Sequence, residues 1–405
     1  MSRVPCAFRP IVGARVSSAS SAPVAMSAFD GMQSQRWAAP PMTSRSTSVT
    51  SAPSDAATVA QVFPAGPAPR MTRRVVGIPQ GYAANPGVLR TRARTLPSVP
   101  VLRHDELTGD VVLVAPGRAA RPHTTAPVVE ADPSTCPFCP GHESQTPPEV
   151  ARVGGGGPDT PGWRIRVFPN LYPAVGGPDA GPGATGAHEV VVLSPDHHRT
   201  LAGLDDEAVV ELVGVLRARA RAHAAAGHAH VQVVVNQGRA AGASIAHPHA
   251  QVLALDFVPP AVAAALARFA TSDRVVEDHE AAATADGAVL TRGDTAAWCS
   301  PSSSAGFEVR LAALGGGRRF AAASDEEIRD VALALRDTTR LLGAALADPP
   351  YNVVVYDAPT TGDEPYHWWV RLVPRLEVPA GFELGTGVSI EPVDPRHAAA
   401  VLRAE

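Results

Sequence analysis

The segment His247-Pro-His249-Ala-Gln251 places two imidazoles and one amide at alternate positions along the chain. In an extended backbone, residues two apart project from the same face, so these side chains are expected to line one surface. The residues that follow, Val-Leu-Ala-Leu, predict a buried strand. The residues that precede it, 238–244, form a loop of small residues that could approach a phosphate closely. Because burying these polar side chains costs free energy unless each has a partner, we interpret the segment as a site for a ligand or a metal ion.

A second group with chemical potential is the pair of thiols in Cys136-Pro-Phe-Cys139, followed by Pro-Gly. Two thiolates separated by two residues can face the same metal ion, and the glycine lets the backbone turn. The alternative is a redox dithiol, but no strand–CxxC–helix unit of the thioredoxin kind surrounds the motif. Zinc prefers about four ligands, so the pair predicts a metal knuckle that needs about two further ligands from elsewhere. Cys299 is interpreted as a thiol without function.

The elements that must position these groups follow a repeated order of strand, helix, strand, loop and a strand that contains a histidine. Alternating or continuous apolar runs predict the strands, and apolar residues at helical spacing with acids first predict the helices. The first copy consists of 188–193, 205–223, 231–235 and 249–255, and the second of 307–311, 324–346, 352–356 and 367–373. The sequence therefore predicts an α+β fold of two related units.

We expect three segments along the chain. The first segment is 1–95. Its residues 1–70 are rich in Ser, Ala, Pro and Arg without periodicity, which indicates a disordered segment, an organellar transit peptide or a spurious extension upstream of a start at Met71. The Arg-only, Ala- and Pro-rich usage favours the spurious extension over the transit peptide. Residues 96–258 form the first predicted unit, with the cysteine pair and the histidine segment. Residues 259–405 form the second.

Charge and composition exclude several classes of function. None of the 35 basic residues is lysine, which excludes Schiff-base enzymes, Walker-A phosphate loops and kinases that depend on a strand lysine. Residues 96–405 carry a formal net charge of −13, against +9 for residues 1–95. Because a protein that binds nucleic acid needs a basic surface, a nucleic-acid partner is not expected. No apolar run approaches the roughly 18 residues that span a membrane, so no membrane partner is expected either.

Several motifs in the same order resemble the galactose-1-phosphate uridylyltransferase family of the histidine-triad superfamily. The matches extend from about residue 99 to about residue 399. Besides Cys-Pro-Phe-Cys-Pro-Gly and Ser-Ile-Ala-His-Pro-His-Ala-Gln, they include Arg118-Ala-Ala-Arg121-Pro, Phe168-Pro-Asn170-Leu-Tyr-Pro, Ser194-Pro-Asp-His197, Tyr366-His-Trp and Gly381-Phe-Glu-Leu-Gly-Thr-Gly387. The resemblance implies two histidine-triad-like units with mainly antiparallel sheet and packed helices.

By this resemblance His249 is the nucleophile. It attacks the α-phosphorus of UDP-glucose, releases glucose 1-phosphate and holds UMP as a phosphoramidate, which galactose 1-phosphate then accepts. Neutral imidazole suits this role because it is nucleophilic near pH 7. Gln251 is implied as the amide that donates to a phosphate oxygen as charge develops.

The resemblance also implies the remaining site residues. Nucleotide and phosphate contacts are expected from Arg118, Arg121, Asn170, Asn236 and the loop Gly242, Ala243 and Ser244, and sugar-phosphate contacts from Phe382. Zinc is expected to be bound by Cys136, Cys139, His197 and His247, with His198 as the alternative to His197. Four protein ligands leave no open position, so this zinc would be structural.

The motifs are compatible with three functions. The first is the uridylyltransferase of galactose metabolism, acting on UDP-glucose and a hexose 1-phosphate. The second is an ADP-glucose phosphorylase, in which inorganic phosphate is the acceptor, and the third is a non-catalytic zinc-stabilised nucleotide-binding protein. The intact set His247, His249 and Gln251 argues against the third. A cytoplasmic protein is expected, and the resemblance implies a homodimer. The preferred base and hexose stay open.

Overall fold

The computed structural model of the chain describes residues 99–104, 109, 111–115, 118, 132–177, 180–271 and 286–405. All of them belong to one compact unit, Ala84–Glu405. The segment 1–95, for which the sequence predicts disorder or a spurious extension, lies outside the described residues.

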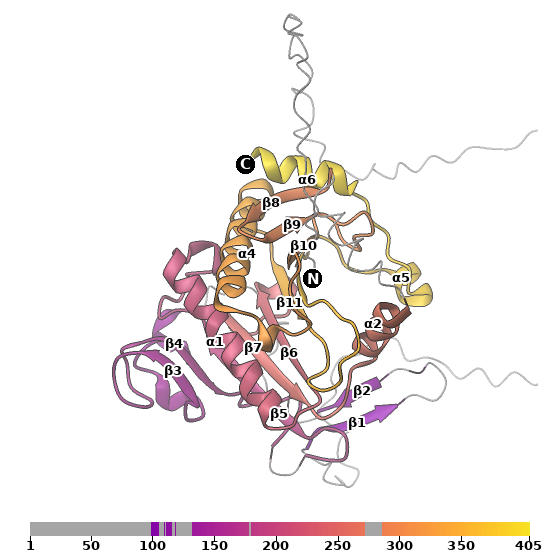
Figure 1. The fold of residues 1–405 in the computed structure, drawn as a ribbon. Helices are drawn as coiled ribbons and strands as arrows, with labels where there is room; N and C mark the ends of the chain where they lie inside the picture. Colours follow the sequence, from indigo (N-terminus) through magenta and orange to yellow (C-terminus); the bar gives the residue numbers. More distant parts are fainter. Residues whose placement is uncertain are drawn as a thin grey trace, which may run out of the picture. The chain divides into compact units, whose positions relative to one another are not determined.

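A ten-stranded sheet organises this unit (Figure 1). All the pairings between its described strands are antiparallel. In spatial order the strands are β3 (Ala151–Gly154), β4 (Trp163–Pro169), β5 (Gly186–Val192), β7 (His249–Leu255), β6 (His230–Gln237), β11 (Tyr351–Tyr356), β12 (Trp369–Pro374), β10 (Val309–Ala313), β9 (Thr295–Trp298) and β8 (Ala288–Arg292). A separate hairpin pairs β1 (Val101–His104) with β2 (Val111–Val114).

Two long helices, α1 (Asp206–Ala225) and α4 (Asp325–Leu346), pack against each other and against one face of the sheet. Each begins at a side-chain cap, since Asp205 accepts from the Ala208 amide and Ser324 from the Glu327 amide. The shorter elements are α2 (Pro260–Thr271), α5 (Gly381–Thr386), α6 (Pro395–Ala404) and the 3₁₀ turns η2 (Pro133–Thr135), η3 (Glu143–Gln145), η4 (Leu201–Gly203), η5 (Arg239–Ala241) and η6 (Phe320–Ala322).

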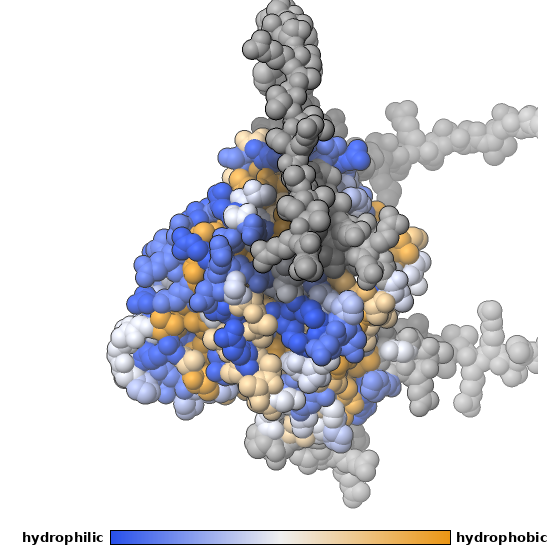
Figure 2. Space-filling view, viewed as in Figure 1, coloured by the Kyte–Doolittle hydropathy of each residue, from blue (hydrophilic) through white to orange (hydrophobic). Residues whose placement is uncertain are grey.

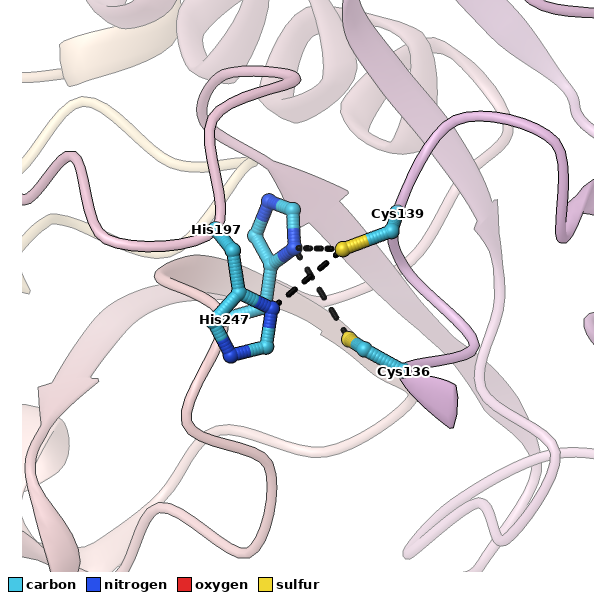
Figure 3. Close-up of side chains that lie close together, drawn as sticks. All are labelled: Cys136, Cys139, His197 and His247. Atoms are coloured by element: carbon cyan, nitrogen blue, oxygen red, sulfur yellow. Dashed lines mark hydrogen bonds between the residues drawn. The ribbon is translucent and has the colours of Figure 1, made fainter. Parts of the chain in front are cut away.

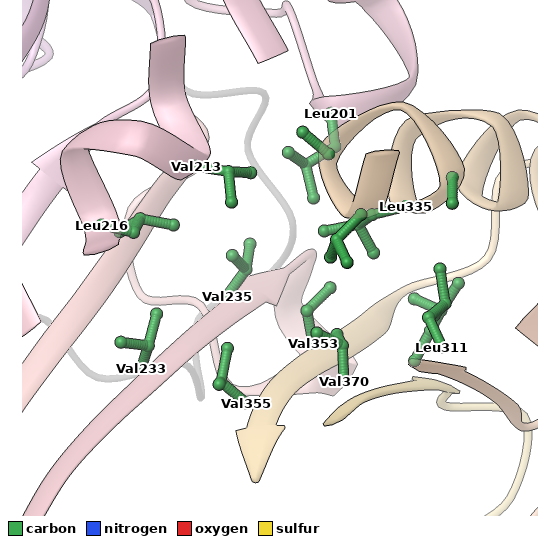
Figure 4. Close-up of a cluster of buried hydrophobic side chains, with 14 of the residues drawn as sticks. Leu201, Val213, Leu216, Val233, Val235, Leu311, Leu335, Val353, Val355 and Val370 are labelled. Atoms are coloured by element: carbon green, nitrogen blue, oxygen red, sulfur yellow. The ribbon is translucent and has the colours of Figure 1, made fainter. Parts of the chain in front are cut away.

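The main core lies between the sheet and these two helices (Figure 4). Alternate residues of each central strand enter it, as β6 shows with Val231, Val233 and Val235. Burying each such side chain contributes about 1.5–3 kcal/mol. The outer surface over α1 and α4 is mainly hydrophilic (Figure 2), as the helical spacing of their apolar residues requires. Among the described helices, none combines the length and apolar character needed to cross a bilayer.

The order β5–α1–β6–β7 occurs again as β10–α4–β11–β12, and the two copies join where β6 pairs with β11. The predicted α+β fold with two related units and a mainly antiparallel sheet is confirmed. The boundary between residues 258 and 259 stays a prediction. His367, expected inside a strand, lies two residues before β12 begins.

The strand alternation also decides where chemistry can occur. In β7, Ala250 and Val252 pack into the core beneath α1, so His249 and Gln251 project from the opposite face of the sheet. The helices therefore stabilise one face and leave the other free for a site.

Gly186, at the start of β5, has a φ of 142°, and a Cβ there would overlap the carbonyl oxygen of Ala254 in β7. We expect Gly186→Ala to lower the free energy of unfolding by about 3 kcal/mol, because the backbone conformation and the close approach both exclude a side chain. Denaturant unfolding measures the change. Gly214→Ala, in open space within α1, is the matched control and should raise stability by up to about 1 kcal/mol. Equal effects would show that Gly186 tolerates a side chain.

Candidate active site and metal centre

The side chains of Cys136, Cys139, His197 and His247, four potential metal ligands, lie close together (Figure 3). Their ligand atoms all lie within 4.8 Å of one another. Cys139 Sγ is 3.3 Å from His197 Nδ1 and 3.5 Å from His247 Nδ1, and Cys136 Sγ is 3.8 Å from His247 Nδ1. The structure thus brings together all four predicted ligands from three distant segments of the chain.

The ring orientation of His247 is fixed by a hydrogen bond on its far side. Its Nε2–H donates to the carbonyl oxygen of Ser194 at 2.8 Å, which leaves the lone pair of Nδ1 facing the thiols. Burial lowers the pKa of His247 to about 4, so the ring is neutral at pH 7. His198, the predicted alternative to His197, is exposed and lies outside the cluster.

The chemistry of this donor set suits a metal ion. Burial, together with the neighbouring Cys136, raises the pKa of the Cys139 thiol. A thiolate in this place is therefore unfavourable unless a cation compensates it. Two thiolates and two neutral imidazoles are a ligand set of structural zinc sites. These four side chains could therefore hold such an ion.

His249 lies two residues beyond this cluster and is 5% exposed. Its Nδ1–H donates to the carbonyl oxygen of His247 at 2.9 Å. This bond leaves the proton of the neutral ring on Nδ1 and an unprotonated lone pair on Nε2. The ring edge also packs against Phe138, with centroids 5.2 Å apart. His249 is thereby held in the tautomer that a nucleophile needs.

A cavity of about 190 Å³ opens over His249 on the face of the sheet away from α1. One part of its lining is polar, and the rest is aromatic or aliphatic, which suits a phosphate attached to a flat ring. The lining residues are Pro137, Phe138, Gln145, Thr146, Pro147, Phe168, Asn170, Leu171, Tyr172, Val190, Ser244, Ile245, His249 and Gln251.

The small-residue loop forms a tight 3₁₀ turn beside this cavity. The amide of Gly242, which has a φ of 89°, donates to the Arg239 carbonyl, and the amide of Ala243 donates to the Gly238 carbonyl. Within the predicted loop, Ser244 is the residue that lines the cavity.

Asn236 lies at the junction of the two units rather than in the cavity lining. Its Oδ1 accepts from Asn352 Nδ2 at 2.7 Å, and the same Nδ2 lies 2.8 Å from the Ala241 carbonyl oxygen. Asn352 of β11 therefore ties the loop of the first unit to the second. Sequence reasoning assigned no role to Asn352, since only the pairing of β6 with β11 sets it opposite Asn236.

The other predicted substrate residues are more dispersed. Asn170 lines the cavity, and Arg118 Nη1 donates to the Tyr172 carbonyl oxygen at 2.7 Å, on the same loop. Phe382 lies on α5, is 51% exposed and is absent from the cavity lining. Arg121 lies outside the described residues.

Comparison with known proteins agrees with this geometry. Residues 181–259, which run through β5, α1, β6 and β7, match the model of the galactose-1-phosphate uridyl transferase N-terminal domain. Over 330 residues the chain is 33% identical to the ADP-glucose phosphorylase of Arabidopsis thaliana, covering 75% of this chain and 92% of that protein. The chain belongs to the galactose-1-phosphate uridylyltransferase family. The family predicted from the motifs is confirmed, and the protein is a nucleotidyltransferase of this family.

Solved structures of the family share the fold. The crystal structure of an Arabidopsis thaliana ADP-glucose phosphorylase with bound ADP-glucose has a TM-score of 0.61 and 29% identity, covering 76% of this chain and 99% of that one. A uridylyltransferase structure has a TM-score of 0.59 and 26% identity, covering 75% of this chain and 97% of that one.

Proposed function

We propose that the protein transfers a nucleoside monophosphate from a nucleotide sugar through a covalent nucleotidyl intermediate on His249. The observation that carries this proposal is the bond from His249 Nδ1–H to the His247 carbonyl, which leaves Nε2 of the neutral ring unprotonated. Nε2 attacks the α-phosphorus, an N–P bond forms, and the P–O bond to the β-phosphate breaks to release the sugar 1-phosphate. An acceptor phosphate oxygen then attacks the same phosphorus and breaks the N–P bond.

The charge that develops on the phosphate in both steps must be met without lysine. Gln251 and Ser244, which share the cavity with His249, are proposed to donate to the non-bridging oxygens. Asn170 and Arg118 are proposed to contact the nucleotide. Nucleotide or phosphate contacts also stay a prediction for Arg121, Asn236, Gly242 and Ala243.

We propose zinc as the ion bound by Cys136, Cys139, His197 and His247. With no open position the ion would take no part in the bond-breaking steps and would hold the fold. Its effect on chemistry would be indirect, because His247 supplies the carbonyl that orients His249.

As donor we favour ADP-glucose, with inorganic phosphate as acceptor. The support is the similarity to the plant ADP-glucose phosphorylase, which extends over 75% of this chain. The second candidate is transfer of UMP from UDP-glucose to a hexose 1-phosphate, the reaction first expected from the motifs. It is supported by the match of residues 181–259 to the family model and by similarity to a uridylyltransferase structure.

Intact mass spectrometry after incubation with each nucleotide sugar distinguishes these functions. ADP-glucose alone is expected to add the mass of AMP to the protein, and inorganic phosphate is expected to remove it with release of ADP. An adduct of UMP from UDP-glucose, discharged by galactose 1-phosphate and not by phosphate, would favour the second candidate. If no nucleotide sugar gave an adduct, both enzyme functions would be rejected in favour of a non-catalytic nucleotide-binding protein.

We also propose that the protein is a homodimer. The exposed apolar side chains Val378, Phe382 and Leu384 cluster in and before α5, and such patches mark interaction surfaces. Sedimentation of the wild type and of Leu384→Glu tests this proposal. A wild-type monomer would contradict it.

A further inference from the structure

His188 of β5 contacts the cavity through its neighbours and has no role in the function proposed above. It is 4% exposed and lies beside β7, where the register pairs it with Leu253 and pairs Val190 with Gln251. Both ring nitrogens of His188 approach polar groups at hydrogen-bond distance. Ala174 N is 3.0 Å from Nδ1, and Gln251 Oε1 is 2.9 Å from Nε2.

These two contacts determine the tautomer of His188. A backbone N–H can only donate, so Nδ1 must accept from Ala174 and carry no proton. The proton of the neutral ring is then on Nε2, and it is donated to Gln251. The amide of Gln251 is thus held with its oxygen toward His188 and its NH₂ group directed elsewhere.

His188, in β5, also bonds to the loop after β4 that forms one wall of the cavity. The amide of Asn170 donates to the His188 carbonyl oxygen at 2.7 Å, and Asn170 Oδ1 accepts from the Tyr172 amide at 2.8 Å. Asn170 Nδ2 lies 3.2 Å from His188 Nε2, and because two donors cannot bond each other, that contact does not compete for the proton on Nε2. Bonds to the loop residues Asn170 and Ala174 therefore hold His188 in position for its contact with Gln251.

We propose that His188 is a positioning residue that holds the NH₂ group of Gln251 toward the reacting phosphate. An amide has nearly the same shape after a flip that exchanges its oxygen and nitrogen. After such a flip, the Gln251 oxygen would face the phosphate oxygens, and repulsion would replace a donated hydrogen bond. The bond from His188 Nε2–H favours the productive orientation. This inference rests on the proposed nucleotidyl transfer.

The test compares two substitutions of similar volume. His188→Gln retains an N–H donor within reach of Gln251 Oε1, whereas His188→Leu removes the donor and keeps the volume. We expect His188→Leu to lower kcat for transfer about 10- to 100-fold with little change in KM, and His188→Gln to recover most of that loss. Melting temperatures of both variants report any general loss of stability.

A double-mutant cycle with Gln251→Ala separates positioning from a structural role. If His188 acts through Gln251, then His188→Leu should cost almost nothing further in the Gln251→Ala background. Additive losses, or equal losses in the Leu and Gln variants, would overturn the inference. The nucleotidyl adduct on wild-type His249 is measured alongside. Its absence would reject the proposed function itself, while its presence together with additive losses would reject only the role of His188.

Discussion

His249→Ala is expected to lower the rate of nucleotidyl transfer by about 10⁴-fold or more, the largest effect of any single substitution in this chain. The substitution removes the Nε2 lone pair, which stays unprotonated because Nδ1–H donates to the His247 carbonyl. The other nucleophilic atoms of the cavity lining are the hydroxyls of Thr146, Tyr172 and Ser244, which are poor nucleophiles without a base. The nucleotidyl adduct should vanish together with turnover.

His228→Ala is the matched control for this substitution. His228 bonds to Asp256, one residue beyond the end of β7, and is absent from the cavity lining, so rate and adduct should both be unchanged. Residual transfer above about a tenth of the wild-type rate in His249→Ala would mean that another group carries the intermediate. Peptide mapping of any remaining adduct would then identify that group.

Local patterns in the sequence predicted the central strands and the two long helices of the core, but not β4, β8 and β9, which also contribute to it. The predicted helix at 205–223 is α1, Asp206–Ala225, and the predicted strand at 231–235 lies within β6. Both depend on periodicity and capping, which are properties of neighbouring residues. The alternation in 247–251 likewise predicted that His249 and Gln251 share a face, because that relation holds within one strand.

Contacts between distant segments could not be predicted in this way. Arg166, 1% exposed, bonds to Glu149 at 3.1 Å and to Asp159 at 2.5 Å, and also to Thr146, which lines the cavity. The order of the sequence does not reveal these bonds of Arg166, since they depend on the register of β3 and β4. The same holds for His188, whose hydrogen bond with Gln251 depends on the pairing of β5 with β7. Family resemblance supplied the metal ligands, where spacing alone gave only the cysteine pair.

Cys139→Ser is expected to remove the bound metal ion and to lower the free energy of unfolding by at least about 3 kcal/mol. Cys139 is the ligand that approaches both imidazoles, at 3.3 and 3.5 Å, so its loss leaves three mismatched donors in a buried site. For the unit Ala84–Glu405 the melting temperature should fall by about 5 °C or more. Metal content is measured by elemental analysis, and the wild type with a chelator should melt like the variant.

Cys299→Ala is the control, because Cys299 is also a buried thiol but lies outside the cluster of potential metal ligands. It should keep the metal and lose no more than about 1 kcal/mol to the small cavity. Loss of activity in Cys139→Ser without a change in melting temperature would contradict a structural role for the ion. If stability and activity fall together, the link lies in His247, whose ring faces the thiols while its carbonyl orients His249. Releasing that ring would shift the carbonyl as well, so an ion bound by these four residues would also help to keep His249 in its reactive tautomer.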